Sequence, residues 1–240
     1  MNRKSTPPRH YFSFRSPYSW LAFRDMKELY GHLPDELTWI PYWDPDEDIL
    51  ARTRAAGADF VYVPMSKEKH RYLLQDIRRL TQRRNLRVTW PFDNAVRWEV
   101  AHIGYFPAAE QGRGLEYIDR VYQARWTEGR AIDDPAVIAD IATELGLDPE
   151  LVSTAADDPR YRDLAVEALS TAFHDDVFGP PLFIVGRQKY WGLERLEEFV
   201  EAVRARGNPE PVADITPADT DQRGEPQLVG ADISHAGGCG

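Results

Sequence analysis

A long helical block divides this sequence of 240 residues into two parts that carry β-strand patterns. Residues 10–14 and 37–42 precede the block and residues 182–185 and 189–191 follow it, all with the aromatic or β-branched content of strands. The ranges with helical spacing are 17–30, 46–56, 66–84, 94–104, 114–128, 134–145, 148–155, 159–173 and 193–206. This order predicts an α/β fold, in which a mixed sheet is flanked by helices.

The order of the elements is typical of a thioredoxin-like mixed sheet with a large helical insertion. We expect a thioredoxin-like domain built from residues 10–45 and 175–206, and a helical insertion domain at 46–174. Residues 207–240 are rich in Pro, Gly, Asp and Thr, have no Phe, Trp or Tyr, and contain six acids against one arginine. Such a segment buries too little apolar surface to offset its ordering entropy, which predicts a disordered acidic C-terminal tail.

Charge and cysteine content exclude several classes of function. The net charge of -10 disfavours nucleic-acid binding, because phosphate repels an acidic protein. The lone cysteine, Cys239, excludes a disulfide framework, a thiolate zinc site and a Cys-x-x-Cys redox pair. The histidines lack the paired spacing of zinc ligands, so we expect no metal. Without a long apolar run or a secretory signal, we expect a cytoplasmic protein with no membrane partner.

A strand followed directly by a helix presents the hydroxyl of Ser16 at the helix start, with Pro17 in the first turn. Backbone N–H groups and the helix dipole favour a negative charge there by about 0.3–1 kcal/mol. The site could therefore hold a thiolate or an oxyanion, although Ser16 could equally be a simple helix cap.

A second candidate segment, residues 177–183, contains consecutive prolines just before a strand. An X-Pro bond at this place can be cis and can expose the preceding backbone to a ligand. Pro181 is the candidate for the cis bond, and an ordinary trans turn is the alternative.

Four segments together resemble the thioredoxin-fold family of 2-hydroxychromene-2-carboxylate isomerases and kappa-class glutathione transferases, which are relatives of DsbA. The resemblance covers about residues 10–206. Ser16-Pro17-Tyr18-Ser19 is similar to the family's Ser-Pro-Tyr-Ser motif, and residues 177–181 to its Val-Phe-Gly-Val-Pro segment. Residues 190–196 are similar to the family's Phe-Trp-Gly-x-Asp-Arg-Leu segment. Residues 69–91 are similar to the start of the family's helical insertion.

The resemblance implies a thiol-assisted isomerase that acts on a conjugated double bond of a small molecule. Ser16 would be the catalytic residue and would hydrogen-bond the sulfur of glutathione or another low-molecular-weight thiol. Lys69, Pro180, Pro181 and Glu194 would bind this cofactor. For Lys69 a solvated helix charge, and for Glu194 an acid in a first helical turn, are the simpler alternatives.

Two departures from the family pattern predict weak glutathione binding. Pro180, which precedes the candidate cis-proline, has no N–H to offer the peptide backbone of glutathione. The family's glutathione-binding asparagine has no counterpart in residues 57–61. Two lost hydrogen bonds of about 1 kcal/mol each weaken binding by tens-fold.

The sequence leaves the substrate class and the competing functions open. The substrate could be an aromatic-pathway intermediate or a polyunsaturated acyl chain. A kappa-like glutathione S-transferase and a non-catalytic binding subunit without a thiol cofactor are the alternatives to an isomerase. Serine at both Ser16 and Ser19 excludes a disulfide oxidoreductase. The sequence also leaves the oligomeric state open, and a homodimer is the candidate assembly.

Overall fold

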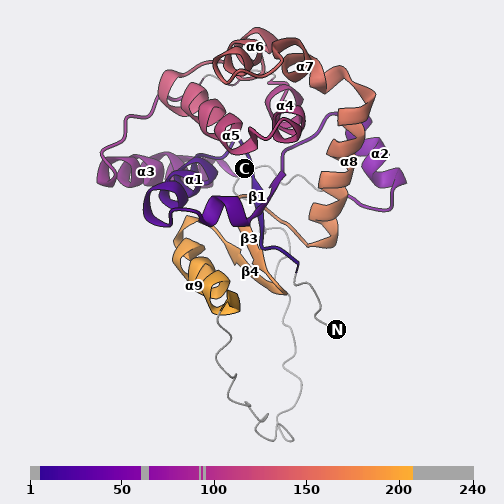
Figure 1. Ribbon diagram of the computed structural model, residues 1–240. Helices are drawn as coiled ribbons and strands as arrows, with labels where there is room; N and C mark the ends of the chain where they lie inside the picture. Colours follow the sequence, from indigo (N-terminus) through magenta and orange to yellow (C-terminus); the bar gives the residue numbers. More distant parts are fainter. Residues whose placement is uncertain (1–5, 61–64, 92, 94–95, 208–240) are drawn as a thin grey trace, which may run out of the picture.

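A mixed sheet lies at the centre of the computed structural model, which describes residues 6–60, 65–91, 93 and 96–207 (Figure 1). Within these ranges it has the strand order β2-β1-β3-β4, and the bounds are β1 Arg9–Phe12, β2 Thr38–Pro41, β3 Leu182–Val185 and β4 Gln188–Trp191. Strands β1 and β2 are parallel, whereas β1 with β3 and β3 with β4 are antiparallel. The predicted thioredoxin-like mixed sheet is confirmed.

The two faces of the sheet are covered by different helices, because successive strand residues point to opposite sides. On one face Tyr11 and Leu182 pack with Ala172 of α8, the helix Pro159–His174. On the other face the neighbouring residues Phe12 and Phe183 belong to the main core. That core includes residues of α1 (Pro17–Leu29) and of α9 (Leu196–Gly207).

The helical block between β2 and β3 packs into the same core as the sheet. Its remaining helices are α2 Glu47–Ala55, α3 Lys67–Arg83, α4 Glu99–Glu110, α5 Gly114–Gln123, the π-helix η2 Ala124–Glu128, α6 Pro135–Glu144 and α7 Pro149–Thr154. Figure 1 shows α4 to α7 gathered at one end of the molecule and α9 at the other, with the sheet between them. One cluster of buried side chains joins Phe12 of the sheet to Ile118 and Ile141 of the block. The division into two domains stays a prediction.

Aspartate–proline pairs set the starts of three helices in this block. The side chains of Asp134, Asp148 and Asp158 each accept a hydrogen bond from the N–H two residues ahead, and a proline follows each of them directly. These caps satisfy first-turn N–H groups and pre-set the helical φ angle. The predicted starts of α6 to α8 therefore agree with the structure to within a residue or so.

The helix expected at 94–104 is displaced along the chain. In the structure α4 spans Glu99–Glu110 and passes through Pro107. A proline in a helix normally argues for an earlier end, because its ring removes an N–H donor. Here burial of the helix between α5, α7 and α8 overrides that local preference. The last helix also starts later than expected, since residues 193–195 form a 3-10 turn before α9.

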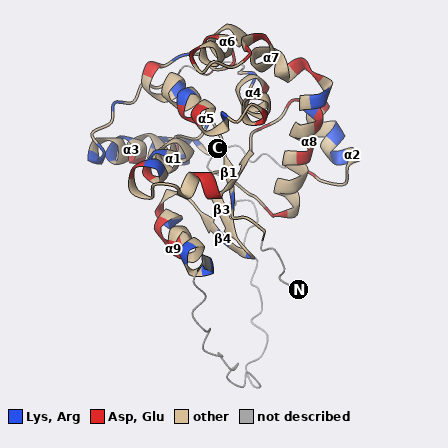
Figure 2. Cartoon of the chain, in the orientation of Figure 1, with Lys and Arg blue, Asp and Glu red and all other residues tan. Residues whose placement is uncertain are grey.

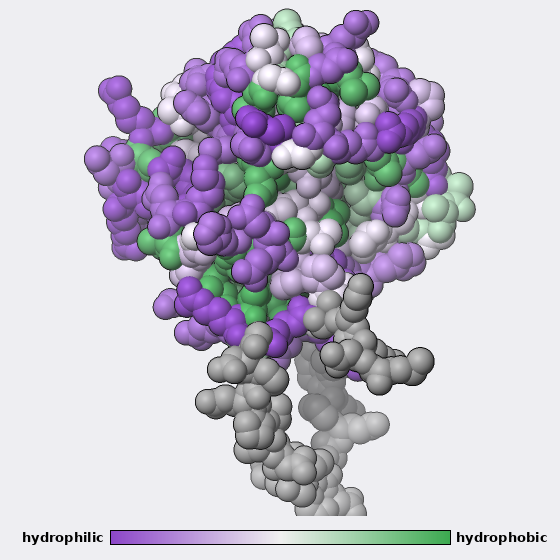
Figure 3. All heavy atoms as spheres, viewed as in Figure 1, coloured by the Kyte–Doolittle hydropathy of each residue, from purple (hydrophilic) through white to green (hydrophobic). Residues whose placement is uncertain are grey.

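Two further expectations concern the C-terminal tail and membrane-spanning segments. The predicted tail, residues 207–240, lies outside the described residues except for Gly207. Among the helices of the described ranges, none combines the length and the apolar composition that crossing a bilayer requires. Figure 3 shows a mainly hydrophilic face on which hydrophobic residues emerge between the helices.

Candidate active site

Ser16 lies at the junction of β1 and α1, where the sequence predicts the reactive position. The side chain is 1% exposed, and its Oγ accepts a hydrogen bond from the N–H of Ser19 at 3.2 Å. The same hydroxyl donates to the carbonyl oxygen of Pro180 at 3.5 Å. The structure therefore brings the helix start and the proline loop into direct contact, although 164 residues separate them in the chain.

The proline loop has the predicted conformation, since the peptide bond between Pro180 and Pro181 is cis. The carbonyl oxygen of Pro181 accepts a hydrogen bond from the N–H of Gly192 at 2.9 Å, which ties the loop to the end of β4. Gly192 has a φ of +92°, and a Cβ there would lie 2.6 Å from Oε2 of Glu194. The Glu194 carboxylate thus lies beside Gly192, so the hydrogen bonds join Ser16 to the proline loop and the loop to the residue next to which Glu194 lies.

Lys69 is placed less directly than the other four. It lies in the first turn of α3, where its backbone N–H donates to Oγ of Ser66 at 3.2 Å. The next residue, His70, lines a groove that opens beside Ser16. Lys69 is not among the described residues that line this groove, and its role in binding a cofactor stays a prediction.

The groove has a volume of about 870 Å³ and is bounded by the start of α1, by α3 and by η2. Arg15 and Pro17, the neighbours of Ser16, line it, whereas Ser16 itself is not among its described lining residues. Its described walls carry three arginines, Arg15, Arg78 and Arg125, but a single carboxylate, that of Asp93. Together with the N-terminus of α1, this excess of positive charge favours an anionic ligand or a thiolate.

Arg125 is a fixed charge in the wall of the groove. Its side chain is 3% exposed and donates to the two carboxylate oxygens of Asp93 at 3.0 and 2.7 Å. The guanidinium lies over the rings of both Trp98 and Trp126, 4.8 Å from each ring centroid. Its Nε is buried without a hydrogen-bond partner in the described structure. The planar, paired and stacked guanidinium cannot easily move, so the positive charge stays in place.

Side chains of the helical block hold the loop that carries Ser16. The N–H of Phe14 donates to Nε2 of His102 at 3.0 Å, and Nδ1 of His102 donates to the carbonyl of Trp98 at 2.7 Å. Tyr122 donates to the carbonyl of Ser13 at 3.1 Å, and Trp126 to that of Phe14 at 3.2 Å. Complete burial lowers the pKa of His102 to about 3, so the ring is neutral and can accept from Phe14.

Comparison with known proteins shows the family of this chain. A family model described as a DsbA-like thioredoxin domain matches residues 9–204. The chain belongs to the DsbA-like thioredoxin family. The resemblance that the sequence motifs indicate is therefore confirmed.

The relatives of this chain include proteins named 2-hydroxychromene-2-carboxylate isomerase. The one from Pseudomonas putida is 29% identical over 194 residues, which are 78% of this chain and 88% of that protein. The one from Sphingobium xenophagum is 28% identical over 200 residues, covering 80% and 94%. A solved structure of such an isomerase matches with a TM-score of 0.64 and 25% identity, covering 83% of this chain and 94% of that one.

Sequence analysis missed two features of the site. These are the walls of the groove and the side chains that hold the loop before Ser16. Arg125 and Asp93 are 32 residues apart, and His102 and Phe14 are 88 apart. No local pattern marks them as partners. The abundance of tryptophan and tyrosine in the sequence is compatible with an aromatic wall but does not locate one.

Replacement of Asp93 by alanine should lower the free energy of unfolding by about 2 kcal/mol, because the buried Arg125 would lose its carboxylate. Urea denaturation followed by circular dichroism measures the loss. The matched control is Asp140→Ala, since Asp140 is 67% exposed and pairs with Arg130 at 2.7 Å. The control should cost less than about 0.5 kcal/mol. Equal losses in the two variants would contradict the stabilising role of Asp93.

Proposed function

We propose that this protein is an isomerase that changes the geometry of a conjugated double bond with the help of a low-molecular-weight thiol. The observation that carries the proposal is the contact of Ser16, at the start of α1, with the residue before the cis Pro181. The names of the P. putida and S. xenophagum relatives support the same reaction class.

The residues of the site fit the sulfur of a thiol. A serine hydroxyl has one proton to donate and two lone pairs to accept. Ser16 accepts from the N–H of Ser19 and donates only over 3.5 Å to Pro180, so its proton can turn to a closer sulfur while the helix cap persists. The helix N-terminus and the charge of Arg15 in the groove wall both favour the thiolate form.

When bound, a thiol supplies a nucleophile that adds reversibly to a conjugated double bond and leaves unchanged, so that the bond can change geometry. The protein's own contribution is to stabilise negative charge at two places. Ser16 and the first turn of α1 stabilise it on the sulfur. The arginines of the groove stabilise it where electrons accumulate on the conjugated substrate.

Glutathione fits the site less completely than a small thiol does. Pro180 is buried beside Ser16 and has no N–H for the peptide backbone of glutathione, while Glu194 is exposed and can meet its ammonium group. We propose that the protein binds glutathione weakly through its thiol end, or uses a smaller thiol.

The reaction is tested by mixing the protein with glutathione, a conjugated cis-alkene and a chromophoric electrophile in separate assays. A changed alkene spectrum without loss of thiol identifies the isomerase. Consumption of thiol by the electrophile identifies a kappa-like transferase instead. Absence of both reactions, with either glutathione or a smaller thiol, would contradict an enzymatic function and favour a binding subunit.

Replacement of Pro180 by valine should strengthen glutathione binding about five-fold, because the variant restores one backbone donor worth about 1 kcal/mol. Calorimetric titration of wild type and variant measures the change, and thermal unfolding of both checks that the loop is intact. Micromolar binding by the wild type would contradict weak binding. A variant with unchanged affinity would shift the cause to the asparagine that residues 57–61 lack.

A further inference from the structure

One wall of the groove is a stripe on α3 that has a charged or ionisable group at each end and leucine in the middle. His70, Leu74 and Arg78 are four residues apart in turn, so they lie above one another on the same helix face. At 1.5 Å per residue, the Cα atoms of His70 and Arg78 are about 12 Å apart. Leu73, which is buried, broadens the apolar middle of this wall.

The lining of the groove also includes two indole rings, those of Trp90 and Trp126. Trp90 and Trp126 meet at right angles, with 5.8 Å between their ring centroids, and Trp90 is 41% exposed. Trp126 is also stacked on Trp20, 6.1 Å away and 15° from parallel, so its orientation is fixed. The leucines of α3 and these indole rings give the groove an apolar part, here called the slot, which favours an apolar or conjugated ligand.

Arg78 is the exposed one of the three arginines in the described lining of the groove, since Arg15 is half-buried and Arg125 is buried. Arg125 is engaged by Asp93, whereas Arg78 is exposed and has no carboxylate partner within the described part of the chain. Figure 2 shows lysines and arginines along α3, in a protein whose net charge is -10. An exposed guanidinium beside an apolar slot suits a ligand that ends in a carboxylate.

The size of the groove indicates an extended ligand. Its volume of about 870 Å³ lies near the upper end of the roughly 300–1,000 Å³ that hold drug-sized molecules. The lining runs from Arg15 and Pro17 at the start of α1 to the leucines and Arg78 of α3, so a conjugated chain has apolar side chains to contact along α3.

We propose that the groove binds an extended conjugated carboxylic acid, with its chain against the leucines of α3 and the indoles of Trp90 and Trp126 and its carboxylate on Arg78. The identity of this ligand as substrate rests on the proposed function, whereas its binding does not. Arg78 is then a specificity-determining residue, because it selects the charged end of the ligand and sets its direction in the slot.

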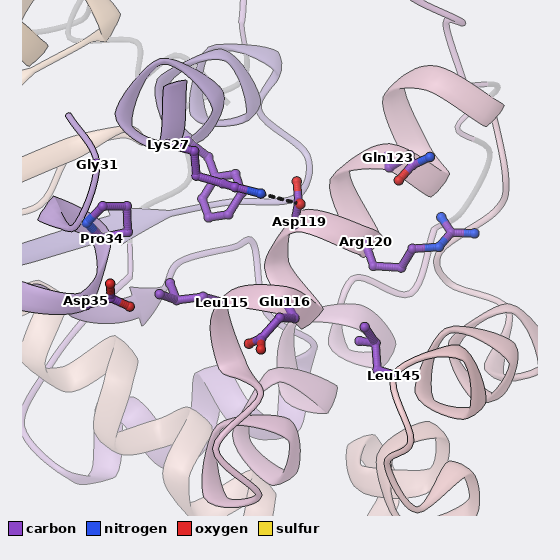
Figure 4. Close-up of a pocket in the computed structure, with 11 residues that line it drawn as sticks. Lys27, Gly31, Pro34, Asp35, Leu115, Glu116, Asp119, Arg120, Gln123 and Leu145 are labelled. Atoms are coloured by element: carbon purple, nitrogen blue, oxygen red, sulfur yellow. Dashed lines mark hydrogen bonds and ion pairs between the residues drawn. The ribbon is translucent and has the colours of Figure 1, made fainter. Parts of the chain in front are cut away.

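A second cavity, of about 390 Å³, lies between α1 and α5 and has the opposite charge character (Figure 4). Its two cations are neutralised, Lys27 by Asp119 at 2.6 Å and Arg120 by Glu128 and Glu144. Asp35 and Glu116 add further negative charge to its lining. A carboxylate is disfavoured there, which makes this cavity an internal control for the groove.

Titration with cis-parinaric acid, a fluorescent conjugated fatty acid, tests the proposal directly. We expect binding that quenches tryptophan emission, and weaker binding of the uncharged methyl ester. Arg78→Gln should raise the dissociation constant of the acid about three- to ten-fold and leave that of the ester unchanged. Arg83→Gln, on the same helix but outside the described lining of the groove, and Lys27→Gln, in the second cavity, should have no effect.

The outcomes separate this proposal from the proposed function. An ester that binds as tightly as the acid, or equal effects of Arg78→Gln and Arg83→Gln, would overturn the assignment of Arg78. If Lys27→Gln alone lost affinity, the ligand would bind in the second cavity, and the proposal for the groove would be wrong. Binding that depends on Arg78, without any change of the alkene in the presence of thiol, would support the groove and contradict the isomerase.

Discussion

Replacing Ser16 by alanine should lower the rate of isomerisation about ten- to a thousand-fold and leave the fold intact. The hydroxyl of Ser16 bridges the first turn of α1 and the carbonyl of Pro180, since it accepts from the N–H of Ser19 and donates to Pro180. Removal of one such donor costs the transition state roughly 1.4–4 kcal/mol. The lost helix cap costs about 1 kcal/mol of stability, too little to unfold a domain.

The rate and the stability of the variant should be measured on the same preparation, by turnover of a conjugated cis-alkene and by urea denaturation. Asp134→Ala is the matched control, because Asp134 caps α6 through the N–H of Ala136 at 2.9 Å, away from the proline loop. The control should lose similar stability and keep its rate. A Ser16→Ala variant with wild-type turnover would overturn the role of Ser16.

The parts of the site that the sequence could predict are those with local signals. Ser16 followed by Pro17 is a helix-start pattern, and consecutive prolines before an apolar strand mark a candidate cis bond. The sheet brings these two segments together, because β1 pairs with β3. Glu194 entered the predicted site only through the family resemblance, and the structure places its carboxylate beside Gly192.

The groove could not be predicted, because its walls come from helices whose relative placement depends on packing over the whole core. Arg125 meets Asp93 only where η2 packs beside the segment that follows α3. The sequence gives no sign that His102 supports the site, yet its ring accepts from the N–H of Phe14, 88 residues away in the chain. The shift of α4 past Pro107 has the same origin, since tertiary burial overrides a local stop signal.

The free energy of unfolding should fall steeply as the pH drops below about 6.5. Burial lowers the pKa of both His10 and His102 to about 3, whereas an unfolded chain has histidines near 6.5. Between these values the unfolded state binds more protons than the folded state, so acid favours unfolding. Each histidine contributes a slope of up to about 1.4 kcal/mol per pH unit, and above about pH 6.5 the stability should be level.

Protonation of His102 in the folded protein should impair activity only near pH 3, because burial lowers its pKa to about 3. A protonated ring has donors on both nitrogens, so Nε2 can no longer accept from the N–H of Phe14. The loop from Ser13 to Ser16 then loses one of its anchors to the helical block. Above that pH, acid lowers stability because the unfolded chain takes up protons, so we expect the protein to keep this anchor for as long as it stays folded.

His10 and His102 can be separated by substitution, because their surroundings differ. His10 is stacked on Phe183 at 4.3 Å between ring centroids, so His10→Phe keeps an aromatic ring in an aromatic cluster and removes one titrating group. Urea denaturation at intervals from pH 4 to 8 should give this variant about half the wild-type slope. The carboxylates with lowered pKa values, such as Asp157 and Glu144, are mostly exposed. Their protonation lowers the free energy of unfolding only below about pH 4. A wild-type stability that stays level from pH 7 to pH 5 would therefore mean that neither buried histidine resists protonation in the folded protein.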